Sequence, residues 1–395
     1  MKFYGTICFA AAMIMLASSL ARGAEPDEIT PPQPIESAPV TDQVEEVIPS
    51  SDDIALAVYV PNLAPGFEFS GGLLYLKPGA DNLGYATITT FLPIGSPQWA
   101  VQELDPNYQP GLSLGARYVF PATGKDMRVD WEHLRTSDSA FVAVDNLATQ
   151  WISPFNQTGP STSESSNEVG VFHLKAAQGQ VEFDYDMVNI DVGQTVNIGS
   201  KTQLRLFGGL AYARLQEQLI STFYNNPNVN PVPPVIAVPN PTLRYITLNN
   251  TSTYTGLGPR LGLNISHDMS YGFSFVSQLS GTVLAGWVQP AQYSFAAVFD
   301  DVVNNEQIAS RTASQVVYAG DAKLGLGYTQ PLGNGSVLTI ESGFRAAVFI
   351  NPFSTYETST NVLPLDIGSL STNSMRHTPS NFTLSGFYAT CSLQW

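Results

Sequence analysis

Apolar and polar residues alternate with a period of two over much of the chain beyond residue 66. The clearest run lies within residues 111–120, where one parity carries Leu112, Leu114, Ala116, Tyr118 and Phe120. Successive side chains of a β-strand point to opposite faces, so this run predicts a strand with one apolar and one polar face. Beyond residue 23 no segment offers roughly 18 uninterrupted apolar residues, which argues against a helical membrane span.

The alternating runs come mostly as hairpins, and long polar segments separate them. Strands are expected at residues 67–77, 111–120, 127–134, 181–192, 204–212, 257–265, 273–287, 316–328, 338–348 and 387–395. Long loops are expected near residues 78–109, 135–178, 216–253, 289–314 and 351–380. Short turns alternating with long loops predict an all-β fold, an antiparallel up-and-down transmembrane β-barrel of about ten strands. Twelve strands is the alternative, if the long segments add strands of their own.

Two positions interrupt the regular pattern. Within residues 181–192 the apolar parity changes at Val188, which indicates either a β-bulge or the edge of the bilayer. Pro259 falls inside an alternating run and lacks a backbone N–H, so a local break in that ladder is expected.

The last strand ends on an aromatic residue, Trp395, and its apolar parity also carries Phe387 and Leu393. A terminal aromatic strand of this kind is associated with recognition by the barrel-assembly machinery, so these three residues are candidates for an insertion signal. Cys391 shares their parity and is expected to face lipid. A half-buried strand in a soluble sandwich is the alternative, but a sandwich would place its charged face outside.

The amino terminus has the features of an export signal. Lys2 precedes an apolar stretch from Ile7 to Leu20 that is too short to span a bilayer comfortably. We therefore expect a signal peptide over residues 1–23, cleaved after Ala21 or Gly23. Residues 24–65 are expected to form a disordered, acidic, Pro-rich periplasmic segment, and residues 66–395 the barrel.

Charge and composition limit the classes of partner that the chain is expected to bind. The chain has a formal net charge of −16, and nine acids with no Lys or Arg lie between Glu25 and Pro65. This balance argues against binding to nucleic acid. The expected partners are outer-membrane lipid and the assembly machinery, and any cell-wall or surface partners are unknown. The predicted location is the bacterial outer membrane, with both termini periplasmic.

The charged residues on the polar parity are the candidate lining of a lumen. They are Arg117, Arg128, Asp130, Glu132, Glu182, Asp184, Asp186, Arg205, Arg260, Asp321, Lys323, Glu341 and Arg345. One hypothesis is a passive pore whose field selects small solutes or ions. The other is a salt-bridged plug, because a ten-stranded barrel is only slightly wider than one that side chains fill.

Signals for catalysis are sparse. The four His residues lie at strand ends or in loops, and His173 with Glu168 or His377 with Asp366 would be the pairs to test for a rim hydrolase. Asp300-Asp301 and Glu306 are as typical of solvated loops as of a calcium site. We predict no enzyme activity, and no catalytic, cofactor-binding or metal site.

Several strand patterns resemble those of the Legionella major outer-membrane protein family of pore-forming barrels. They are Gly66–Leu76, Gly111–Tyr118, Asp191–Gln194 and Gly256–Leu263. The resemblance extends over roughly Gly66 to Trp395 and leaves out the acidic segment. It implies a porin-like or structural surface role and supplies no catalytic residue. The expected function is a passive pore, with a non-conducting structural or adhesive surface protein as the alternative.

Overall fold

The computed structural model describes residues 58–61, 63–90, 98–145, 149–154, 174–224, 243–299, 302–309, 311–332, 335–362 and 370–395. Within these residues there is no helix of the length and apolarity that a membrane crossing requires. The predicted signal peptide and most of the predicted acidic segment lie outside the described residues.

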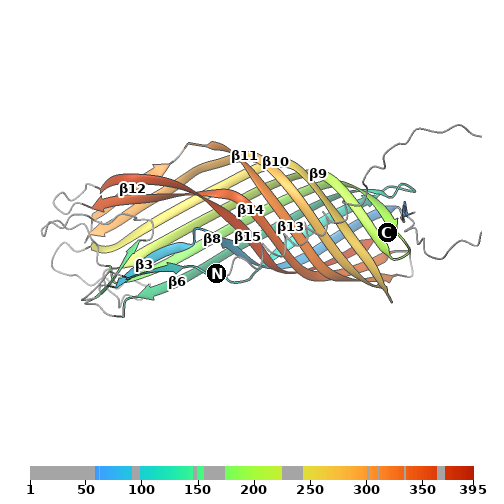
Figure 1. Cartoon of the computed structure of the whole chain (residues 1–395), viewed down its shortest axis with the longest axis horizontal. Coiled ribbons are helices and arrows are strands. Elements are labelled where there is room, and N and C mark those ends of the chain that lie inside the picture. The colour runs from blue at the N-terminus through green and yellow to red at the C-terminus, as the bar shows by residue number, and fades with distance from the viewer. Residues whose placement is uncertain are drawn as a thin grey trace, which may run out of the picture. The chain divides into compact units, whose positions relative to one another are not determined.

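Ten antiparallel strands close into a barrel, as predicted (Figure 1). They are β2 (Gly66–Ala80), β5 (Gln109–Val119), β6 (Lys125–Ala143), β8 (Ala176–Ile198), β9 (Thr202–Tyr224), β10 (Leu243–Ser270), β11 (Phe273–Phe299), β13 (Ala313–Pro331), β14 (Val337–Val362) and β15 (Leu370–Gln394). Their order around the ring is β8-β6-β5-β2-β15-β14-β13-β11-β10-β9, and β9 pairs with β8 to close it. The first and last strands of the ring, β2 and β15, are therefore neighbours.

Further strands lie where the sequence predicted coil. β1 (Val58–Tyr59) pairs with β8 although it falls in the predicted disordered segment. β12 (Val302–Ala309) extends the β11 hairpin. A separate three-stranded sheet, in the order β4-β3-β7, joins two predicted loops through β3 (Gly84–Thr90), β4 (Gln98–Glu103) and β7 (Gln150–Pro154).

The two ends of the barrel differ. Short connections join β5 to β6, β8 to β9, β10 to β11 and β13 to β14 at one end, which we term the turn end. Trp395 also lies there, since it exchanges backbone hydrogen bonds of 3.2 and 3.0 Å with Phe67 at the start of β2. Tyr271 and Gly272, with φ of 57° and 83°, form the tight turn between β10 and β11. The opposite end is termed the loop end.

The ring strands are longer than predicted. β10 has 28 residues and β15 has 25, whereas a tilted strand needs only about 9–11 residues to cross a bilayer. The excess lies at the loop end, within segments that the sequence predicted to be loops. The barrel therefore continues well beyond the thickness of a membrane.

The two faces of the strands exchange character part-way along the barrel. On β8 the outward residues Val188, Ile190 and Val192 are apolar toward the turn end, whereas Val181, Phe183, Tyr185 and Met187 are buried inside toward the loop end. β8 pairs with β6 and β9 without a register shift, so the change at Val188 is not a bulge. The outward apolar band at the turn end is termed the belt, and it is the lipid-facing surface of the barrel.

The break expected at Pro259 is confirmed on one side of β10. The ladder with β11 passes from Leu257 to Arg260 and omits Gly258 and Pro259, while the ladder with β9 continues through both. The break is therefore confined to one edge of the strand.

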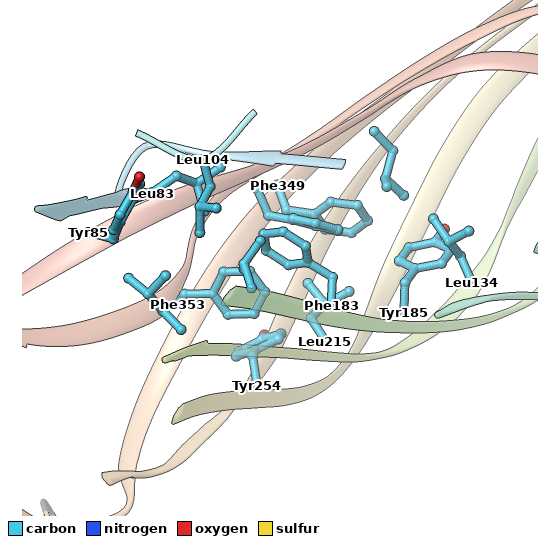
Figure 2. Close-up of a cluster of buried hydrophobic side chains, with 14 of the residues drawn as sticks. Leu83, Tyr85, Leu104, Leu134, Phe183, Tyr185, Leu215, Tyr254, Phe349 and Phe353 are labelled. Carbon is cyan, nitrogen blue, oxygen red and sulfur yellow. The ribbon is translucent and has the colours of Figure 1, made fainter. Parts of the chain in front are cut away.

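The hydrophobic core fills the loop-end half of the barrel interior. It draws side chains from β2, β8, β9, β10, β14 and β15 and from the small sheet (Figure 2). Gly179 leaves room for the small sheet, because a Cβ there would lie 2.5 Å from the ring of Tyr85. We use the term aromatic layer for the following five core residues: Phe183, Tyr185, Phe349, Phe353 and Phe382.

Candidate functional site in the barrel lumen

The turn-end half of the lumen holds a polar cavity of about 400 Å³. Its wall includes charged side chains from β2, β5, β6, β9, β10, β13 and β14. The cavity lies inside the belt, so each strand there separates an apolar outer face from a polar inner face. This is the arrangement that alternation with a period of two produces when lipid is outside and water inside.

The structure places ten of the thirteen predicted lumen residues on the inner face. They are Arg117, Arg128, Asp130, Glu132, Arg205, Arg260, Asp321, Lys323, Glu341 and Arg345. Nine of them line the cavity, and Arg345 lies buried against Glu132 and Asp321.

Glu182, Asp184 and Asp186 do not line the lumen. They lie on the outer face of β8 beyond the belt, where Asp186 is 2.9 Å from Nδ1 of His133. Their inward neighbours are Phe183 and Tyr185 of the aromatic layer. The prediction failed because it assumed that polar residues face the lumen along the whole strand. Beyond the membrane the outer face of the strand is polar instead.

These outward acids have basic neighbours. Register places Asp184 opposite Arg135 and Asp186 opposite Arg214. One ligand atom each from His133, Asp184 and Asp186 lies within 4.8 Å of the others. The flanking guanidinium groups offset the negative charge of this surface cluster.

One ionic network crosses the lumen from side to side. Glu132 on β6 accepts hydrogen bonds from Lys323 of β13 at 3.1 Å and lies 2.7 Å from Arg345 of β14. β6 and β13 stand on opposite sides of the ten-stranded ring. Arg345, 1% exposed, also binds Asp321 at 2.9 Å and donates to the Tyr185 hydroxyl at 3.3 Å. The two halves of the wall are thus tied together across the interior.

A second network runs along the wall around two carboxylates that the sequence analysis missed. Asp126 accepts hydrogen bonds from Arg117, at 2.9 Å, and from Arg205. Asp191 accepts one from Arg260 at 2.5 Å. Asp126 shares the parity of Arg128 on β6, and Asp191 alternates with the outward residues Ile190 and Val192 on β8, so the local alternation was the available signal.

Small and aromatic residues shape the space around these guanidinium groups. A Cβ on Gly193 would lie 2.5 Å from Nε of Arg205, so only glycine leaves room for that side chain. The ring of Phe207 lies 5.0 Å from Cζ of Arg205 and 5.1 Å from that of Arg260, which are cation–π distances. The guanidinium groups are therefore held in fixed positions.

The cavity lining is electrically balanced. Its acids are Glu68, Asp130, Glu132, Asp321 and Glu341, and its bases are Arg117, Arg128, Arg205, Arg260 and Lys323. With five of each, the wall has no charge excess that would favour one sign of solute strongly.

The aromatic layer closes the lumen above the cavity. The ring of Phe183 on β8 lies 6.3 Å from that of Phe353 on β14 and 5.4 Å from that of Phe382 on β15. β8 and β14 are also on opposite sides of the ring. Figure 2 shows Phe183, Tyr185, Phe349 and Phe353 gathered in the interior between ribbons of the wall. Side chains from facing strands therefore touch at the centre of the barrel.

A further buried acid, Glu217 on β9, lies at the level of this layer and was missed by the sequence analysis. It is 1% exposed, and register pairs it with Phe183. No lumen was expected there, because residues 216–253 were interpreted as a loop.

The remaining predictions fall outside the described side chains. These are His173, Glu168, His377, Asp366, Asp300, Asp301 and Glu306. The insertion-signal residues Phe387 and Leu393 lie on the outer face of β15, and Trp395, directly after the strand, is exposed and stacks its ring on Phe69 of β2 at 5.3 Å. Cys391 faces outward with them.

Solved structures share only a distant likeness with the chain. The outer membrane protease OmpT from Escherichia coli has a TM-score of 0.39 at 9% identity, over 84% of this chain and 98% of its own. A FadL homologue from Pseudomonas aeruginosa has a TM-score of 0.27 at 11% identity, over 83% and 90%. A major outer membrane protein from Thermus thermophilus has a TM-score of 0.23 at 11% identity, over 66% and 98%. Identities and scores this low say nothing about activity.

No curated protein matches the sequence. A family model does, and it extends over residues 59–395, from β1 to the terminal Trp395. Its description is the Legionella pneumophila major outer membrane protein precursor. The match covers the whole described barrel and agrees with the lipid-facing belt around a polar lumen. The chain therefore belongs to the Legionella pneumophila major outer membrane protein family.

Proposed function

We propose that the chain is an outer-membrane channel for small polar solutes or ions, and that the conformation described is its closed state. The observation that carries the proposal is the division of the interior into two parts. A polar cavity lined by ten acidic or basic side chains lies within the membrane, and a packed aromatic layer lies directly above it.

The polar part supports a passage. Burying ionisable groups within the membrane thickness is costly, so a barrel whose interior served only as filling would be expected to use apolar side chains there. The balanced lining predicts weak discrimination between cations and anions. This differs from the cation preference that the overall charge of −16 would suggest, because three acids of β8, Glu182, Asp184 and Asp186, face outward.

The packed part supports a closed state. An aromatic contact and an ion pair join strands on opposite sides of the ring, so side chains obstruct the middle of the lumen. Passage therefore requires displacement of the aromatic layer. Loss of its contacts costs several kcal/mol, which makes openings rare.

The orientation is part of the proposal. Short turns face the periplasm in outer-membrane barrels, so we assign the turn end and both termini of the barrel to the periplasm. The cavity would then open toward the periplasm, and the loop end with its core would stand outside the cell. The terminal strand, with Trp395 at the periplasmic rim, would engage the assembly machinery.

Planar bilayer recordings of the full-length protein test the proposal. We expect few and brief conductance steps from the wild type, and a rise of at least tenfold in open probability for the double variant Phe183→Ala/Phe353→Ala. The matched control is Phe344→Ala, a phenylalanine on the outer face of β14, which should behave as the wild type does. Silence from both the wild type and the double variant at high protein concentration would refute the channel.

A structural surface protein is the second candidate. The observation that favours it is the closure itself, together with strands of 25 to 28 residues that carry the barrel beyond the membrane. In that case the ionic networks would only hold the wall together, and the double variant would lose stability without gaining conductance.

A further inference from the structure

The Glu217 carboxyl is an acid buried in the apolar half of the barrel. Among the described residues its one hydrogen-bond partner is Asn82, whose Nδ2 donates to Oε1 at 2.8 Å. Oε2 is buried and accepts no hydrogen bond from any of them. Burial of an ionised carboxylate with so little compensation is strongly unfavourable, so this environment selects the neutral acid.

The position of this carboxyl links it to the closure. Register pairs Glu217 with Phe183 on one side and with Ser252 on the other. Phe183 contacts both Phe353 and Phe382 across the lumen. Asn82 in turn accepts a hydrogen bond from Ser380 at 2.7 Å, two residues before Phe382. The carboxyl therefore adjoins both sides of the aromatic layer.

Among the side chains that the structure describes, no charged group near the carboxyl compensates it. The elements packed around it bring Tyr185, Tyr254 and Tyr85 to the interior, and the first two donate their hydroxyl hydrogens to Glu132 and to the Leu284 carbonyl. Asp81 binds Asn381 at the surface, and Lys175 donates to the Gln150 carbonyl. Arg345 lies one level lower, bound to Asp321, Glu132 and Tyr185.

We propose that the Glu217 carboxyl is a proton switch for the closure: the neutral acid allows the aromatic layer to pack across the lumen, and loss of its proton hydrates the layer and opens it. The expectation that opening produces conductance rests on the proposed function. The hydration of the aromatic layer on loss of the proton does not depend on that function.

The direction of the pH dependence follows from the two states. Glu217 lies beyond the belt, and burial raises the pKa of its carboxyl to about 8 from an ordinary value of 4.5, against a smaller lowering by the Asn82 hydrogen bond. When the layer opens, water restores the ordinary pKa. Closure is therefore fully favoured below pH 4.5, weakens as the pH rises toward about 8, and changes little above it. Each pH unit within that window changes the ratio of open to closed protein by up to about tenfold.

The first experiment is a pH series of bilayer recordings with the full-length protein. Wild-type open probability should rise steadily between pH 5 and pH 8 and then level off. Glu217→Gln keeps the shape and the acceptor for Asn82 but cannot ionise, so its open probability should stay at the acidic level throughout. Glu182→Gln removes an outward acid from the neighbouring strand and should follow the wild type. A variant Glu217→Gln that kept the wild-type pH dependence would overturn the proposal.

The second experiment does not depend on conduction. Infrared difference spectra between pH 6 and pH 9.5 should show loss of one protonated carboxyl band in the wild type and in Glu182→Gln, and none in Glu217→Gln. Amide hydrogen exchange in the loop-end half of β8 and β9, corrected for the intrinsic effect of pH, should accelerate over the same range only where Glu217 is present. Absence of the band from the wild type would overturn the switch.

The two proposals fail in different ways. Conductance without pH dependence, or without the infrared band, refutes the switch and leaves the channel standing. Proton-linked exchange in a protein that stays silent in bilayers refutes the channel and leaves the switch standing.

Discussion

The role of a single residue in this barrel depends on which face of its strand it occupies. Arg345 is the clearest case, because its guanidinium is buried and holds Glu132 and Asp321 across the lumen. Its partners are charged, so removal of the cation takes from Asp321 its ion-pair partner and leaves Glu132 with Lys323 alone.

We therefore expect Arg345→Met to lower the free energy of unfolding by about 3–5 kcal/mol. Urea titration of the protein in lipid vesicles, followed by tryptophan fluorescence, measures the change. Arg135→Met is the matched control, since Arg135 is 72% exposed and 3.8 Å from Glu182 on the outer surface, and its loss should stay within about 0.5 kcal/mol. Equal effects of the two substitutions would show that the network across the lumen adds no stability.

Ten of the charged residues that the sequence assigned to the lumen lie on its inner face, whereas the three assigned beyond the belt face outward. Charged residues such as Arg117 and Lys323 alternate with apolar residues that face lipid, so parity alone assigns them to the lumen. Asp184 alternates with Phe183 in the same way, yet it faces outward. The sequence does not mark where the bilayer ends, and that boundary reverses the meaning of each face.

Strand β8 shows the same reversal at the level of an element. Its outward residues change from Val192 and Ile190 within the belt to Asp186 and Asp184 beyond it, with no change of register. The strand thus passes from lipid to water with no change in its backbone pairing. Only the polarity of its outward side chains changes.

Two substitutions on this one face test the position of the transition. Val192→Arg places a cation in the belt and should cost about 2–4 kcal/mol, whereas Gln180→Arg on the same face beyond the belt should cost less than about 1 kcal/mol. The same unfolding titration in vesicles compares them. A large cost for Gln180→Arg would mean that the membrane covers the loop-end half.

The aromatic layer is a second element-scale feature, because it needs β8, β14 and β15 together. Phe353→Ala removes a fully buried ring and should lower the free energy of unfolding by about 3–5 kcal/mol. Phe344→Ala, on the lipid side of the same strand, should cost clearly less. Similar losses would indicate that Phe353 packs loosely and does not close the lumen.

Strand number was predictable and strand length was not. Each of the ten belt segments alternates with apolar residues outward, and that template finds ten strands. The loop-end continuations place polar residues such as Gln216, Gln218 and Thr222 outward, where the template requires apolar residues, so the template rejects them. The small sheet of β3, β4 and β7 joins segments more than forty residues apart, a pairing that no local pattern specifies.

The molecule as a whole combines two barrels of opposite character in one set of strands. The turn-end half has a membrane protein's apolar exterior and polar interior, and the loop-end half has a soluble protein's polar exterior and packed core. We propose that the first half provides the passage and the second half closes it. Family membership is consistent with either an open or a closed barrel, so closure itself has to be measured.

Labelling of a cysteine placed in the cavity tests that closure most directly. Gln278→Cys in a Cys391→Ala background puts a thiol on the cavity wall, and the other cysteine, Cys8, falls in the predicted signal peptide. A membrane-impermeant thiol reagent applied outside intact cells should leave it unlabelled, and should label it once Phe183→Ala and Phe353→Ala are added. Glu182→Cys, on the outer surface beyond the belt, should react in both backgrounds. Rapid labelling of Gln278→Cys with the aromatic layer intact would contradict the account.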